Sequence, residues 1–209
     1  MLRAIKINPG YAVARYWYVT YLAAMGRQEE ALAESHRALE LEPLSLVINA
    51  VLGFACYYAR RYDAAIEHYR RIIEMDPSFF PAHLLLGSAY AQKGEWALAV
   101  VEFQEAGQLD DTPWPLAKLG QTYALSGQRE EAQNVLQELH ALAGQRYVSA
   151  FDVALIHAAL GEKDRAFEWL NKAFEERSSW LVFTKVEPGL DGLHGDPRFQ
   201  ELVQRVGLP

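Results

Sequence analysis

The chain has 209 residues, of which 51% are hydrophobic and 22% charged, and it carries a formal net charge of −7 with one cysteine, Cys56. This composition excludes a disordered chain, an internal disulfide and a multi-thiolate metal site, and the single cysteine fits a reducing, cytoplasmic setting. No apolar run reaches the length of about 18 residues that a membrane-spanning helix needs.

The distribution of charge argues against nucleic acid as a ligand of this segment. Residues 61–110 carry four Lys and Arg against eight Asp and Glu, and residues 161–209 carry seven against nine. Neither segment has the basic surface that grips a phosphate backbone. The same acidity disfavours binding to an anionic membrane surface.

Residues 1–9 predict a single helix that ends at a proline. Ala4 lies five residues before Pro9, as Ala38 does before Pro43. We therefore expect residues 1–9 to be the second helix of a preceding repeat whose first helix is absent, and the chain to be part of a longer protein.

The next segments repeat. One alanine recurs at steps of 34, 34, 33 and 34 residues, at Ala31, Ala65, Ala99, Ala132 and Ala166. A glycine stands five residues before four of these alanines, at Gly26, Gly94, Gly127 and Gly161, and Arg60 takes that place in the second repeat. A second glycine stands twelve residues before three of them, at Gly53, Gly87 and Gly120. A fixed period of this length is the signature of a stacked helical array.

Each unit reads as two helices joined at the turn glycine. In the second unit the first helix is expected to end near Ala59 and the second to run from Tyr62 to Met75, before Pro77. Small residues such as Gly53 and Ala65 allow the two helices to approach closely. The predicted units are residues 10–43, 44–77, 78–111, 112–144 and 145–177.

These motifs resemble the tetratricopeptide repeat. The resemblance rests on Leu-Gly-x-x-Tyr in "LLGSAY" and "LGQTYA", on the small residue at Ala99 and on the closing prolines. It implies an all-α solenoid of about five helix-turn-helix repeats. The departures are few: other residues replace the early tryptophan, one residue is missing near Asp111–Thr112, and the fourth and fifth units lack the closing proline.

In this family the first helices line a concave face where extended peptides or helices bind. Alignment of the repeats transfers these first-helix positions to this chain. The expected partner-binding residues are Tyr16, Thr20, Phe54, Tyr57, Tyr58, Leu84, Ser88, Gln92 and Gln121, and Leu125 and Leu155 occupy equivalent positions in the later units. These residues are apolar or aromatic with a few neutral polar groups. The pattern favours an apolar partner segment anchored by aromatic side chains.

The same positions disfavour a clamp for an acidic C-terminal tail. Such a clamp holds carboxylates with lysine, arginine and asparagine, and Lys118 is the single basic residue nearby. The alternative for each aromatic residue is packing against a neighbouring helix.

The helix that begins the first unit is aromatic on several faces. Tyr16, Trp17, Tyr18 and Tyr21 wrap most of its circumference, which is unusual for a solvated end helix. We expect a partner, a preceding unit or a second copy of the chain to cover it. Self-association through this N-terminal end is the last of these alternatives.

No motif for catalysis, metal binding or a cofactor stands out. The six histidines never lie three or four residues apart, as helical metal ligands would. His157 and Cys56 occupy the position that Tyr90 and Tyr123 have in their own units, which predicts packed core side chains. The chain also lacks a phosphate-binding glycine loop and a nucleophile elbow.

Residues 178–209 have no counterpart earlier in the chain and are expected to cap the array. Asp196 and Pro197 suit a helix start and Gly207 a helix end. The helix between them has one apolar face, formed by Phe199, Leu202, Val203 and Val206. Under it we expect Trp180, Leu181 and Phe183.

The tail also resembles the C-terminal end of a bacterial group of tetratricopeptide regions. In that group the repeats follow a winged-helix DNA-binding, serine/threonine kinase or cyclase domain. The similar stretch runs from "ALGEKDRAFEWLNKAF" to "DPRFQELVQRVGLP", with departures at Gly192, His194 and Gly195. The resemblance implies the interaction or sensory part of a signalling protein.

Three function classes are compatible with these features. The sequence favours a non-catalytic protein-interaction scaffold. A sensor that binds a small molecule or peptide in the groove is the second class, and an enzyme using His194, Asp196 and Arg198 is the third. The enzyme hypothesis lacks a second polar cluster that would supply a substrate pocket and an orienting partner.

Overall fold

A computed structural model describes residues 1–208 of the chain. Within these residues the chain forms helices joined by short connections and no strand, so the predicted all-α solenoid is confirmed. A first short helix, α1 (Leu2–Ile7), packs against α2. None of the helices in the described part is long and apolar enough to cross a membrane.

The helices from α2 to α11 form consecutive pairs. The pairs are α2 (Ala12–Ala24) with α3 (Gln28–Leu41), α4 (Leu46–Tyr58) with α5 (Tyr62–Met75), α6 (Phe80–Gln92) with α7 (Trp96–Leu109), α8 (Trp114–Leu125) with α9 (Arg129–Leu142), and α10 (Ala150–Ala159) with α11 (Lys163–Glu175). The prediction of a helix from Tyr62 to Met75 matches α5.

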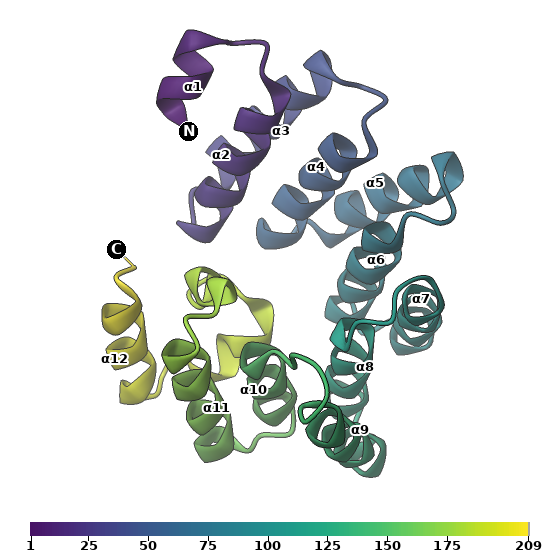
Figure 1. Cartoon of the computed structure of the whole chain (residues 1–209), viewed down its shortest axis with the longest axis vertical. Coiled ribbons are helices and arrows are strands. Elements are labelled where there is room, and N and C mark those ends of the chain that lie inside the picture. The colour runs from purple at the N-terminus through teal and green to yellow at the C-terminus, as the bar shows by residue number, and fades with distance from the viewer. Residues whose placement is uncertain (209) are drawn as a thin grey trace.

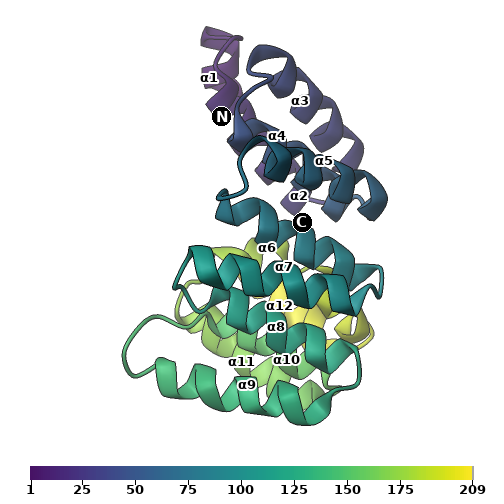
Figure 2. The same cartoon turned by 90° about the vertical axis from the view of Figure 1, so that its right-hand side faces the viewer.

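The pairs follow a curved path (Figure 1). The first helices of the pairs, α2, α4, α6, α8 and α10, pack on one another in turn and form the inner face. The second helices lie on the outer face, where α7 and α9 come to the front in Figure 2. The path curls far enough for the segment that directly follows α11 to lie inside the curve, between the first and last pairs.

Small residues set the distance between the two helices of a pair. The recurring alanines are fully buried. A Cβ atom on Gly53 would lie 2.5 Å from the ring of Tyr69, and one on Gly87 would lie 2.8 Å from the ring of Phe103. These two glycines therefore make room for a buried aromatic ring of the partner helix, and Gly120 makes room for Val135, which would lie 2.6 Å from a Cβ atom there.

The glycines at the turns between the two helices of a pair are explained by their backbone conformation. Gly26, Gly94, Gly127 and Gly161 end the first helices with φ between 71° and 81°, in the left-handed region that glycine adopts at little cost. Arg60 adopts the same conformation, with φ 59°, in the second pair. A side chain in this conformation costs about 1 kcal/mol or more.

The C-terminal segment consists of two 3-10 helices, η1 (Ser179–Phe183) and η2 (Pro188–Leu193), and of α12 (Pro197–Val206). The Asp196 carboxylate accepts a hydrogen bond from the N–H of Arg198 at 3.0 Å, and Gly207 ends the helix with φ 77°. The predicted start and end of this helix are confirmed, and Phe199, Leu202 and Val203 of its predicted apolar face are buried in one core with residues of α10 and α11. Position 209 of the predicted cap lies outside the described residues.

Candidate partner-binding groove

The C-terminal segment folds back along the inner face of the array. The ring of Phe183 stacks on Tyr58 with the centroids 4.9 Å apart and meets Phe54 edge-on at 5.6 Å. The ring of Trp180 lies 5.1 Å from that of Trp114 on α8. Residues from the tail thus contact helices that are more than 60 positions away in the sequence.

Leu181 and Phe183 of η1 take different positions. Leu181 packs with α12, as predicted. The prediction for Phe183 is wrong, because its ring belongs to the core that the first three pairs form. The residues are two apart on a tight helix, so they point in different directions, and this part of the chain joins the cap to the inner face. The ring of Trp180 contacts both cores.

Arg60 anchors the tail from the second pair. Its guanidinium donates to the backbone oxygen of Val186 at 3.2 Å and to the Asp191 carboxylate at 2.8 Å. Since glycine occupies this turn position in the other pairs, these contacts explain why a strained arginine stands here.

Glu187 is buried where the tail meets α4. Its carboxylate accepts hydrogen bonds from the Tyr58 hydroxyl and from the N–H of Gly189, each at 3.2 Å. Burial raises the pKa of Glu187, and Lys118 and these two hydrogen bonds oppose the shift. Lys118 also forms an ion pair with Asp152 at 3.3 Å. The contact region is therefore a buried polar cluster around the tail.

Replacing Glu187 by glutamine is expected to stabilise the protein at neutral and higher pH. Because the pKa of Glu187 is raised in the folded state, the folded protein holds this proton more tightly than the unfolded chain. This tighter proton binding stabilises the folded protein at pH values below the pKa that Glu187 has in the unfolded chain. The stabilisation is lost as the pH rises through the higher pKa that Glu187 has in the folded protein. The amide stays neutral and keeps a hydrogen bond to each partner.

Urea unfolding of both proteins at about pH 4 and about pH 8 measures this effect. We expect the variant to have the larger free energy of unfolding at the alkaline pH. The difference between the two proteins is expected to be smaller at the acidic pH. A variant that is less stable at about pH 8 would show that the ionised carboxylate stabilises the fold.

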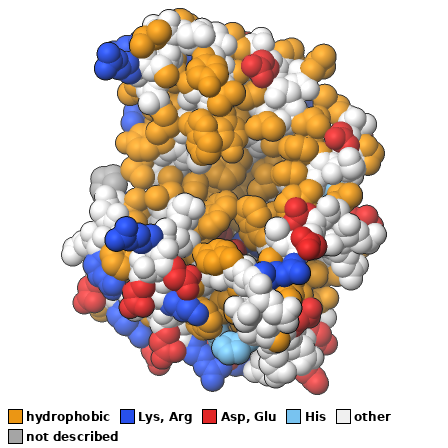
Figure 3. Space-filling model, in the orientation of Figure 1, with side chains coloured by type: hydrophobic (Ala, Val, Ile, Leu, Met, Phe, Trp, Pro, Cys, Tyr) orange, Lys and Arg blue, Asp and Glu red, His pale blue; other side chains and the backbone are white. Residues whose placement is uncertain are grey.

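An apolar groove of about 670 Å³ remains beside the tail. Its walls come from the inner helices α2, α4 and α6 and from η1. It is lined by Tyr16, Trp17, Thr20, Val47, Ala50, Val51, Phe54, Phe79, Pro81, Leu85, Ser179, Trp180, Val182 and Phe183. Figure 3 shows hydrophobic side chains around a hollow in the middle of this face.

The structure brings three of the predicted partner-binding residues together in this groove: Tyr16, Thr20 and Phe54. Ser88 lies with Phe54 in a narrow space of about 40 Å³ next to the tail. Gln92 is half-buried near the end of α6 and is not among the groove residues. The hydroxyl of Thr20 donates to the backbone oxygen of Tyr16 at 3.0 Å, and that of Ser88 to Leu84 at 2.9 Å.

The remaining predicted residues do not face an open groove. Tyr57, Tyr58, Leu84 and Gln121 are only 8%, 6%, 2% and 7% exposed. These four side chains are buried between the closely packed inner helices and the tail, which favours the alternative of packing against neighbouring elements. A Cβ atom on Gly189 of the tail would lie only 2.5 Å from the Gln121 amide nitrogen.

The sequence reasoning missed most of the groove walls. The residues missed on or beside the inner helices are Val47, Ala50, Val51, Phe79, Pro81 and Leu85, whereas Trp17 was expected only as part of the aromatic surface of the first unit. Those of the tail are Ser179, Trp180, Val182 and Phe183. The apolar stretch "WLVF" was visible in the sequence, but its position against α4 follows from the return of the chain rather than from the repeat.

The polar residues before α12 have structural partners. Arg198 donates to the Asp196 and Asp164 carboxylates at 2.8 Å, and this pairing lowers the pKa of Asp196 to about 2. The ring of His194 packs against Phe199 with the centroids 4.5 Å apart. Within residues 1–208 no three His, Cys, Asp or Glu side chains are grouped as metal ligands. His157 and Cys56 are buried, as predicted.

Comparison with known proteins identifies the repeat. Residues 55–112 match the tetratricopeptide repeat family. A relative from Methanocaldococcus jannaschii, TPR repeat-containing protein MJ1428, is 23% identical over 160 residues. The match covers 76% of this chain and 28% of that protein, so the chain spans little more than a quarter of the relative's length.

Solved structures share the fold. TTC0263, a thermophilic TPR protein of Thermus thermophilus, has a TM-score of 0.65 and 21% identity, over 86% of this chain and 98% of that one. YrrB, described as a TPR protein with an unusual peptide-binding site, has a TM-score of 0.50 and 20% identity, over 88% and 95%. Residues 55–112 are thus similar to the tetratricopeptide repeat, and the chain shares the helical solenoid fold of these solved structures.

Proposed function

We propose that this tetratricopeptide-repeat chain is a non-catalytic scaffold that binds an extended or helical apolar segment of a partner protein in the inner groove. One observation carries the proposal: a groove of about 670 Å³ whose walls are apolar except for Thr20 and Ser179. Tetratricopeptide-repeat proteins are generally protein-protein interaction scaffolds, which supports the coarser part of this proposal.

The chemistry of the groove supports an apolar ligand. Trp17 is 56% exposed, Val47 49% and Val182 38%, so large apolar side chains meet solvent around the opening. The hydroxyl of Thr20 already donates to its own helix. None of the described residues that line this groove is a cation, and Lys118 of α8 forms an ion pair with buried Asp152, which disfavours capture of an acidic tail.

The shape supports a polypeptide segment over a small molecule. Figure 3 shows a hollow that is open to solvent, whereas small-molecule sites bury most of their ligand. A sensor for a small molecule is therefore the second candidate. The groove also belongs to the end of the array where Trp17 and Tyr21 are exposed, so a second copy of the chain can compete with the partner there.

The proposed setting is cytoplasmic and bacterial. In it, the repeats form the interaction half of a signalling protein whose effector domain precedes them. The tail resemblance described above supports this assignment, and the net charge of −7 supports a protein partner over nucleic acid for this segment.

Alanine at Trp17 together with alanine at Val182 tests the groove. Both side chains are largely exposed, so the variant is expected to keep its stability within about 1 kcal/mol. Affinity capture from the source cells followed by mass spectrometry is expected to lose a partner that the unchanged chain retains, by about tenfold or more.

The matched control is alanine at Leu98, which is 45% exposed on the outer helix α7. It removes a comparable apolar side chain away from the groove and is expected to keep every partner. Retention of all partners by the groove variant, or an equal loss in the control, contradicts the assignment.

A further inference from the structure

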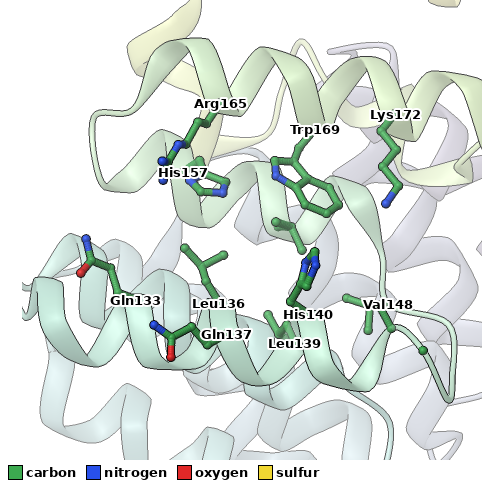
Figure 4. A pocket seen from close by; sticks show the side chains of 13 residues that line it. Gln133, Leu136, Gln137, Leu139, His140, Val148, His157, Arg165, Trp169 and Lys172 are labelled. Atoms are coloured by element: carbon green, nitrogen blue, oxygen red, sulfur yellow. The ribbon is translucent and has the colours of Figure 1, made fainter.

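A second groove, of about 730 Å³, lies on the outer face between α9 and α11 (Figure 4). Its walls come from these two helices, from the connection that follows α9 and from the edge of α10. It is lined by Gln133, Leu136, Gln137, Leu139, His140, Ala143, Gly144, Val148, Val153, His157, Arg165, Trp169 and Lys172.

This groove exists because the packing changes between the fourth and fifth pairs. Four residues separate α3 from α4, α5 from α6 and α7 from α8, whereas the seven residues 143–149 separate α9 from α10. In the earlier pairs the second helix packs closely on the next first helix. Here α10 packs on its pair partner α11 and on α8 but hardly on α9, so one side of α9 is left uncovered.

The side chains that line this groove form two facing stripes, in which Leu136 and Trp169 are half-buried and the polar members are exposed. On α9 the stripe consists of Gln133, Leu136, Gln137 and His140, and on α11 it consists of Arg165, Trp169 and Lys172. Both have the spacing of one helix face. At the same positions in the repeat, α7 carries Leu98, Glu102 and Glu105. The α11 stripe is therefore basic and aromatic where an earlier unit is apolar and acidic.

The lining is also positive in an acidic protein. Among the described residues that line the groove none is a carboxylate. The Arg165 guanidinium lies 3.4 Å from the Glu162 carboxylate. The same carboxylate also contacts His157 and Arg129. Lys172 lies 3.9 Å from Glu176, and its ammonium sits 4.4 Å from the centre of the Trp169 ring.

The equivalent groove beside α5 has mixed charge. It is lined by Asp63, Ile66, Glu67, Arg70, Arg71, Glu74, Tyr90, Lys93 and Glu95. Tyr90 there corresponds to His157 in the groove beside α9. The positive lining is thus a property of one position in the array and not of the repeat.

We propose that an acidic amphipathic helix of a partner protein docks in the groove between α9 and α11. Its apolar face packs on Trp169 and Leu136, and its carboxylates pair with Lys172 and Arg165. Positions 133 to 140 span about 10 Å along α9, so a docking helix of two to three turns fills the groove. This site is on the opposite face from the inner groove, and the two allow the chain to hold two partners at once.

The test uses a fluorescein-labelled helical peptide of about 14 residues, with leucine at every third or fourth position and glutamate on the flanks. A second peptide has lysine in place of each glutamate. Fluorescence anisotropy with the whole chain at low salt is expected to show at least about tenfold tighter binding of the glutamate peptide.

Charge reversal locates the site. Lys172→Glu and Arg165→Glu are each expected to weaken binding of the glutamate peptide by about tenfold, and both side chains are exposed enough to leave the fold intact. Arg71→Glu, an equally exposed residue on α5, is the matched control and is expected to change the affinity less than about twofold. Equal affinity for the two peptides, no binding of either, or equal weakening by the control overturns the proposal.

Discussion

Alanine in place of Phe183 is expected to lower the free energy of unfolding by about 3 to 5 kcal/mol, the usual cost of removing a buried phenylalanine ring. The ring is 4% exposed and packs on both Phe54 and Tyr58. The loss leaves a cavity between the tail and α4, which separates the C-terminal segment from the inner face. Urea unfolding followed by circular dichroism measures the effect.

The matched control is the preceding residue. Val182 belongs to the same 3-10 helix but is 38% exposed, so its replacement by alanine is expected to cost less than about 1 kcal/mol. If Phe183→Ala costs no more than Val182→Ala, the tail does not pack on the inner face.

Alanine in place of Gly53 is expected to destabilise the protein by about 1 to 3 kcal/mol, although alanine is the better helix former. The new Cβ atom would lie 2.5 Å from the ring of Tyr69, which is fully buried. The overlap therefore forces α4 and α5 apart.

Alanine in place of Gly107 is expected to have the opposite effect on stability. This glycine lies inside α7, and a Cβ atom there meets nothing nearer than Pro115 at 3.8 Å. Alanine at this position is expected to stabilise the protein by about 0.5 to 1 kcal/mol through helix propensity alone. Thermal unfolding of the two variants should give shifts of opposite sign. A stabilising Gly53→Ala change would show that the pair is more loosely packed than the structure has it.

The fold was predictable because it repeats. The alanine series places a buried small residue in each pair, the glycine series adds a close contact in three of them, and the structure shows the aromatic rings that require it at Gly53 and Gly87. The capping helix was predictable for a local reason, since its start, its end and its apolar face are all encoded between Asp196 and Gly207.

The groove was predictable only in part. Register placed Tyr16, Thr20 and Phe54 on the inner face, where they line the groove. It could not show that the tail covers Tyr57 and Tyr58, because a segment outside the repeat has no register that places it. One local signal existed. Arg60 stands at a turn where the other pairs have glycine, and the structure explains it by the contacts with Val186 and Asp191.

The position of the tail bears directly on binding. Trp180, Val182 and Phe183 form one wall of the inner groove, so a partner in it contacts both the first repeats and the C-terminal segment. Loss of the tail is then expected to weaken binding as well as stability. The outer groove between α9 and α11 does not include these residues.

Hydrogen exchange of the tail amides tests most directly whether the C-terminal segment is a fixed part of the inner face. The N–H groups of Val186 and Glu187 donate to the Phe183 oxygen at 2.8 Å, and that of Leu190 donates to the Glu187 oxygen at 3.0 Å. We predict that these amides exchange as slowly as the buried amides around Tyr69 on α5. Exchange at the rate of an unstructured peptide, while α4 and α5 stay protected, would contradict this account.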